Sequence, residues 1–86
     1  MAVPQVILVT QEGCNPCLRV KRLLDEIRPE VGPFETREVQ LSSEEGVELA
    51  VRHNIPFPPA VFVNGRLVAK GKVLEKDLRS ALATTR

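Results

Sequence analysis

The apolar residues of the chain change their spacing several times, and each change marks an expected border between secondary-structure elements. Residues 6–9 form an unbroken apolar run, which is typical of a central strand covered on both faces. A helical spacing follows. It predicts an apolar stripe that faces the core and consists of Val20, Leu23, Leu24 and Ile27. We expect this helix to continue to about Arg28, where Pro29 should end it.

The next two segments are more polar. Residues 34–41 are mostly polar on both faces of a strand, where Phe34, Thr36, Glu38 and Gln40 alternate with Glu35, Arg37, Val39 and Leu41. This predicts a more exposed strand at the edge of the sheet. Ser42 and Glu45 have the spacing of a capping box and predict the start of a helix. We expect that helix to end near residues 53–54. Its buried side is predicted to consist of Val47, Ala50 and Val51.

Two short strands and a helix complete the pattern. Residues 60–63 form an apolar run, and residues 66–70 form a second run with Arg66 and Lys70 at its ends. They are joined by Asn64-Gly65, the signal of a type I′ hairpin turn. Gly71 ends the second run. The stripe of the last helix is predicted from Leu74, Leu78, Ala81 and Leu82.

The expected order is therefore βαβ-α-ββ-α. The first connection should be right-handed and should join two parallel strands, and the hairpin should add two antiparallel ones. We predict an α/β fold with a four-stranded mixed sheet and three helices, in a single domain over residues 1–86.

Both cysteines of the chain lie where the first loop becomes the first helix. Cys14 is expected at the N-cap, beside unpaired amides and the positive end of the helix dipole, which favour the reactive thiolate. Cys17 should lie one turn further, within reach for a disulfide. Redox chemistry is the interpretation that this spacing favours near a βαβ pattern.

Two other interpretations of the cysteines are weaker. A structural disulfide would close a very short loop and stabilise the fold little. A zinc site normally needs four ligands, and His53 is the single histidine besides the two cysteines, so a second chain or outside thiols would have to contribute. His53 itself is expected to be an ordinary residue at a helix end.

The charges of the first helix run against its dipole. Arg19, Lys21 and Arg22 lie in the first half, whereas Asp25 and Glu26 follow in the second. This arrangement is either an ordinary solvated face or a set of cations that helps to hold the Cys14 thiolate.

Composition narrows the classes of function. The 86 residues carry a net charge of +1, with no basic footprint for nucleic acid and no polybasic membrane patch. Residues 1–5 lack a basic n-region, and the apolar run behind them is too short for a signal peptide or a membrane span. We therefore expect a cytoplasmic protein, in which a cysteine pair is more often catalytic than structural.

The first strand leads into the motif Cys14-Asn15-Pro16-Cys17 and the helix after it, and Pro-Ala-Val-Phe-Val-Asn-Gly follows later in the chain. On these features, the chain resembles small glutaredoxin-like and thioredoxin-like proteins over essentially its whole length. The resemblance implies that Pro59 is a cis-proline beside the active site, where substrate docks. It also implies that Asn15 and Pro16 contact substrate and tune the redox potential.

The chain departs from that family at four places. Gly13 stands where thioredoxins have tryptophan, and Leu8 where they have a buried acid that accepts a proton. Gly71-Lys72 replaces the Gly-Gly turn of glutaredoxins, which puts glutathione use in doubt. Pro58 precedes the family's cis-proline and has no N–H, so one of two backbone hydrogen bonds to a substrate strand is lost.

We interpret the chain as a monomeric thiol–disulfide oxidoreductase of cell redox homeostasis and electron transport, without a cofactor. Cys14 attacks a disulfide of a protein or a small thiol, and Cys17 resolves the mixed disulfide. Glutathione or a thiol reductase would supply the electrons. The alternatives are an iron–sulfur or zinc module shared between chains through Cys14 and, within the enzyme class, a glutathione-dependent reductase.

Overall fold

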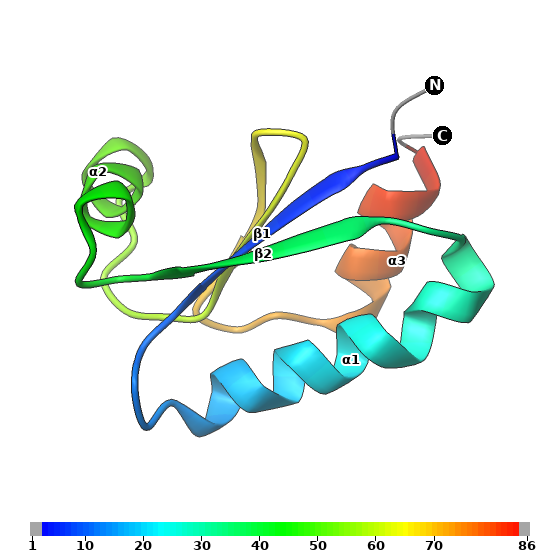
Figure 1. Cartoon of the computed structure of the whole chain (residues 1–86), viewed down its shortest axis with the longest axis horizontal. Coiled ribbons are helices and arrows are strands. Elements are labelled where there is room, and N and C mark those ends of the chain that lie inside the picture. The colour runs from blue at the N-terminus through cyan, green and yellow to red at the C-terminus, as the bar shows by residue number, and fades with distance from the viewer. Residues whose placement is uncertain (1–2, 85–86) are drawn as a thin grey trace.

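Four strands form one mixed sheet in the order β2-β1-β3-β4, as the computed structural model of residues 3–84 shows (Figure 1). The elements follow the predicted order. They are β1 (Gln5–Thr10), α1 (Asn15–Val31), β2 (Glu35–Gln40), α2 (Glu44–His53), β3 (Ala60–Val63), β4 (Arg66–Lys70) and α3 (Glu75–Thr84). Strand β1 runs parallel to β2 and antiparallel to β3, and β3 pairs antiparallel with β4.

The helices divide between the two faces of the sheet. Helices α1 and α3 lie together on one face, and α2 lies on the other (Figure 1). The larger apolar cluster is on the side of α1 and α3 and is built around Val6, Leu8, Leu24, Val61 and Leu78. The smaller cluster, below α2, consists of Val9, Ile55, Ala60 and Phe62.

The position of each of the first two strands follows from its pattern. Val6, Leu8 and Val9 are at most 1% exposed, as expected for the unbroken apolar run of a central strand. Strand β2 lies at the edge, and Val39 is its one buried residue. Both predictions are confirmed.

The predicted end of α1 is wrong by one turn. Pro29 lies inside the helix, which continues to Val31. The helix forgoes the one hydrogen bond that a proline cannot donate. It ends instead at Gly32, whose φ of 92° suits glycine and whose N–H donates to the Arg28 carbonyl at 2.9 Å.

The predicted cap of α2 is shifted by one residue. Ser43 is the N-cap, because its Oγ accepts from the Gly46 N–H at 3.0 Å, and Glu45 pairs with Arg37 rather than closing a capping box with Ser42.

The predicted buried side of α2 is also wrong. Val47 is 51% and Val51 is 79% exposed, and of the three expected residues Ala50 alone packs on the core. The reason is Gly46, the buried residue of the helix. A Cβ there would collide with the Gln40 carbonyl oxygen, so this glycine lets the helix approach the end of β2 closely and turns Val47 and Val51 outward.

The C-terminal half agrees with the pattern, apart from one residue. Asn64 and Gly65 both have positive φ, as a type I′ turn requires. Leu78 and Leu82 are fully buried, but Leu74 precedes α3 and is 39% exposed. The Pro58–Pro59 peptide bond is cis, as expected.

One end of the sheet gathers the segments that carry the sequence motifs. Val9, near the end of β1, pairs with Ala60, the first residue of β3. The cysteine loop that follows β1 and the prolines that precede β3 therefore leave the sheet at the same end.

Candidate active site

Cys14 is the N-cap residue of α1. Its backbone is extended, and its Sγ accepts a hydrogen bond of 3.2 Å from the Cys17 N–H. That N–H is one of the amides at the start of a helix that lack a partner within it. The sulfur of Cys14 therefore lies at the positive end of the helix dipole, where negative charge is favoured.

The two cysteines form a disulfide, and their Cα atoms are 5.2 Å apart. They differ in access: Cys14 is half-buried, whereas Cys17 is 2% exposed and belongs to the core-facing side of α1. The motif thus presents one accessible and one covered sulfur.

A pocket of about 230 Å³ opens beside the disulfide. Both cysteines, the loop before them, one side of α1 and the facing end of β2 line it. The side chains that matter below are Thr10, Cys14, Cys17, Lys21 and Glu38.

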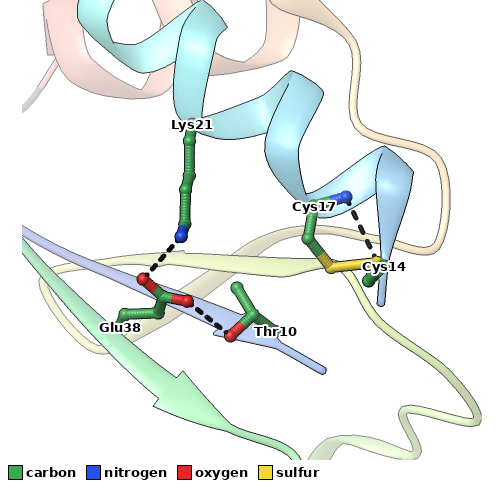
Figure 2. The surroundings of a disulfide bond; sticks show 5 residues. All are labelled: Thr10, Cys14, Cys17, Lys21 and Glu38. Carbon is green, nitrogen blue, oxygen red and sulfur yellow. Dashed lines mark hydrogen bonds and ion pairs between the residues drawn. A yellow bond between two sulfur atoms is a disulfide. The ribbon is translucent and has the colours of Figure 1, made fainter. Parts of the chain in front are cut away.

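Three polar side chains from three elements meet in this pocket. Lys21 Nζ on α1 lies 2.9 Å from Oε1 of Glu38 on β2, and the Thr10 hydroxyl at the end of β1 donates to Oε2 at 2.9 Å. Figure 2 shows Thr10 and Glu38 on the Cys17 side of the disulfide. Lys21 follows Cys17 by one helical turn, so both side chains project from the same face of α1.

These contacts fix the charge of the carboxylate. Hydrogen bonds from Lys21 and then Thr10 lower the pKa of Glu38 below its ordinary value of 4.5, against a smaller opposing effect of burial. Glu38 is thus an anion at neutral pH, in the pocket that both cysteines also line.

Not every predicted site residue borders the pocket. Asn15 and Lys21 do, whereas Pro16, Arg19 and Arg22 are exposed and are not part of its lining. Within residues 3–84, neither Arg19 nor Arg22 forms an ion pair.

The two prolines also lie outside the lining of this pocket. Pro59 is less than 2% exposed, and its carbonyl accepts from the Gly71 N–H at 2.7 Å. Pro58 is half-buried, and the neighbouring Phe57 is 59% exposed. Phe57 and Pro58 are therefore the accessible part of this loop, and Pro59 is its buried part.

The sequence patterns did not single out Thr10 and Glu38. Glu38 pairs in register with Leu8, the position at which the sequence lacks an acid, so its carboxylate comes from the neighbouring strand. The sequence of β2 did not indicate that Glu38 reaches the site, because the register between two parallel strands cannot be inferred from either strand alone.

Within residues 3–84, no three His, Cys, Asp or Glu side chains are grouped so that they could hold a metal ion. No helix in the same range has the length and apolar character to cross a bilayer.

Known structures share this architecture. A thioredoxin-like protein from Clostridium perfringens superposes with a TM-score of 0.75 at 17% identity, over 96% of this chain and 71% of that one. Thioredoxin O2 from Arabidopsis thaliana in its oxidised state gives 0.67 at 19%, over 96% and 75%. A malarial protein gives 0.64 at 20%, over 96% of both chains. These likenesses show the thioredoxin-like fold.

No curated protein sequence matches the chain significantly. The family model of glutaredoxin, however, matches residues 2–68, which include the cysteine motif, the prolines, β3 and the first part of β4. The chain belongs to the glutaredoxin family, and its fold and its Cys14–Cys17 disulfide are those of a thiol oxidoreductase.

Proposed function

We propose that the protein is a dithiol thiol–disulfide oxidoreductase in which Cys14 is the nucleophile and Cys17 the resolving thiol. The observation that carries the proposal is the position of Cys14 Sγ at the N-cap of α1, where it accepts the Cys17 N–H. Such a position lowers the pKa of a thiol and makes the thiolate available near neutral pH.

The reaction proceeds in two exchanges. The Cys14 thiolate attacks one sulfur of a substrate disulfide, and the other substrate sulfur leaves as a thiolate that takes up a proton. Cys17 then attacks Cys14 Sγ, which releases the second substrate thiol and leaves the Cys14–Cys17 disulfide. Two electrons pass from the dithiol to the substrate, and a cytoplasmic thiol donor restores the dithiol.

The exposed surface around the site suggests how a substrate docks. Leu18 borders the pocket and is 50% exposed, and Phe57 next to Pro58 is 59% exposed. We propose that these apolar side chains and Asn15 contact the residues that flank a substrate disulfide. A peptide or protein disulfide fits such a surface better than a small, highly charged thiol does.

The experiment compares wild type with Cys14→Ser and Cys17→Ser on two substrates, a peptide disulfide and a glutathionylated peptide, each with glutathione and with a dithiol reductase as donor. Cys14→Ser should be inactive on both substrates. Cys17→Ser should fail on the peptide disulfide and accumulate a mixed disulfide on Cys14.

The alternatives give different results. Full activity of Cys17→Ser on the glutathionylated peptide, with little wild-type activity on the peptide disulfide, would identify a glutathione-dependent reductase. A protein that is purified coloured and dimeric, with visible absorption lost on chelation, would identify a shared metal or cluster instead.

A further inference from the structure

We infer that Glu38 accepts the proton of the Cys17 thiol during the second exchange, with Lys21 holding the charge in place. The inference rests on the proposed function and adds to it the group that activates the resolving thiol. The pocket that Glu38, Lys21 and Thr10 share with both cysteines is its basis.

Cys17 needs such a group because of where it lies. Its side chain is 2% exposed, so bulk water has little access to the thiol. Burial raises the pKa of a thiol, and the neutral thiol is a poor nucleophile. The N-cap position that activates Cys14 does not serve Cys17, which is already inside the helix. A proton acceptor within the pocket removes this obstacle.

Glu38 meets the geometric requirements. Its carboxylate enters the pocket from β2, on the Cys17 side of the disulfide (Figure 2). Thr10 and Lys21 each hold one of its oxygens at 2.9 Å, which fixes the orientation of the group. The pocket volume of about 230 Å³ is several times the volume of one water molecule, so a water relay can connect the thiol and the carboxylate.

Glu12 is the other carboxylate of the lining. It lies on the exposed loop before Cys14, and within residues 3–84 no hydrogen bond or ion pair holds its carboxylate in the pocket. Glu38 alone is tied to the strand end and to the helix face from which Cys17 projects.

The charges balance throughout the step. Before transfer, the pocket holds the Lys21 ammonium, the Glu38 carboxylate and the neutral Cys17 thiol. The S–H bond breaks, the proton goes to the carboxylate, and the electron pair stays on sulfur. The thiolate then attacks Cys14 Sγ, and the bond between Cys14 and the substrate sulfur breaks. Until that attack, Lys21 faces one negative charge, which moves from the carboxylate to the Cys17 sulfur and does not need to be created in the pocket. The substrate sulfur leaves as a thiolate and takes up the proton that Glu38 holds, which restores the carboxylate beside Lys21.

The test separates the two exchanges. Reduced protein in excess is mixed rapidly with an aromatic disulfide that releases one coloured thiolate when Cys14 attacks and a second when Cys17 attacks. In wild type, the second phase should change little between about pH 6 and 8, because an acceptor with a carboxylate pKa is ionised throughout.

Glu38→Gln removes the acceptor and keeps the shape of the side chain. We expect a first phase that changes by no more than about two- to threefold, the effect of a partly exposed charge. The second phase should be slowed by about a hundredfold at neutral pH, the low end of general-base effects. Its rate should then rise about tenfold per pH unit, because only thiolate formed by direct loss of the proton to solvent reacts. Glu38→Asp keeps a carboxylate and should keep the flat profile.

The matched control is Glu45→Gln. It removes the other ion pair of β2, from Glu45 to Arg37, neither of which lines the pocket, and should leave both phases unchanged. A second phase that is equal or faster in Glu38→Gln, or a steep profile in Glu38→Asp, overturns the inference. Wild type that releases no coloured thiolate in either phase contradicts the proposed function instead, so the two failures are distinguishable.

Discussion

The backbone N–H of Cys17 donates to Sγ of Cys14 at 3.2 Å, within the segment that the disulfide itself closes. Cys17 therefore supplies one sulfur of the disulfide, and its backbone amide stabilises the other sulfur, that of Cys14. Because Cys14 is half-buried and Cys17 is 2% exposed, the two thiols of the reduced protein should react unequally.

We predict that alkylation with limiting reagent labels Cys14 first. The labelling should occur at a lower pH than that of a free thiol, whose pKa is about 8.5. Mass spectrometry of the digested protein measures the distribution. Predominant labelling of Cys17 would reverse the assignment of nucleophile and resolving thiol.

Lys21 should influence the Cys14 thiolate more than Arg22 does. Lys21 borders the pocket and Arg22 does not, although both lie in the first half of α1. We expect Lys21→Gln to slow the alkylation of Cys14 near neutral pH about two- to threefold, as a partly exposed charge contributes about 0.5 kcal/mol. The effect should shrink at high salt. Equal effects of Lys21→Gln and of the control Arg22→Gln would assign the result to the general field of the helix.

Gly46→Ala should destabilise the protein by about 1–3 kcal/mol, the usual range for overpacking. The added Cβ would collide with the Gln40 carbonyl oxygen and lie 2.9 Å from two carbonyl carbons, and a backbone cannot move aside easily. Urea unfolding measures the loss. Val51→Ala, on the exposed side of the same helix, is the control and should change stability by less than about 0.5 kcal/mol.

Glu38 should make stability depend on pH in the acid range. The pKa of Glu38 is below 4.5 in the folded state because Lys21 and Thr10 bind the carboxylate. The stabilisation is therefore complete above the unfolded-state pKa and is lost as pH falls through the lower folded-state pKa. The side chain is 43% exposed, so we expect less than about 1 kcal/mol. NMR titration of the carboxyl carbon measures the pKa directly, and a value above 4.5 would contradict the ion pair.

Pro58→Val tests how a substrate strand pairs with this loop. Pro58 has no N–H, whereas valine at this half-buried position would offer one to a docked peptide. If a substrate strand pairs here, KM for a peptide disulfide should fall, and a tenfold decrease corresponds to about 1.4 kcal/mol. Pro56→Val gains the same donor two residues earlier and serves as the control. An unchanged KM in Pro58→Val would mean that the substrate does not pair with this edge.

The fold was predictable where the signal is local. The apolar run of β1, the Asn64-Gly65 turn and the stripe of α1 each specify their own element, and the structure confirms them. The buried face of α2 was not predictable, because a close approach at Gly46 to a distant strand end decides it.

The candidate site divides in the same way. Cys14 and Cys17 are recognised from their spacing alone. Glu38 enters the site only through its register with Leu8 on the neighbouring strand, and a single sequence carries no sign of that pairing. Among the cations of α1, Lys21 borders the pocket, where it pairs with Glu38 on β2, and the helix sequence alone does not show this.

The unequal cover of the two faces of the sheet has a consequence for motion. Helix α2 is the one helix on its face within residues 3–84, and the cluster below it is the smaller of the two. Segments with few buried apolar contacts open at the lowest free energy in native-state hydrogen exchange. The amides of α2 should therefore exchange before those of β1 and α1, in a sub-global opening. Cys17 and Lys21 belong to α1, whose N-cap is Cys14, and Thr10 belongs to β1. Helix α2 can therefore open while the amides of the elements that carry the site stay protected from exchange.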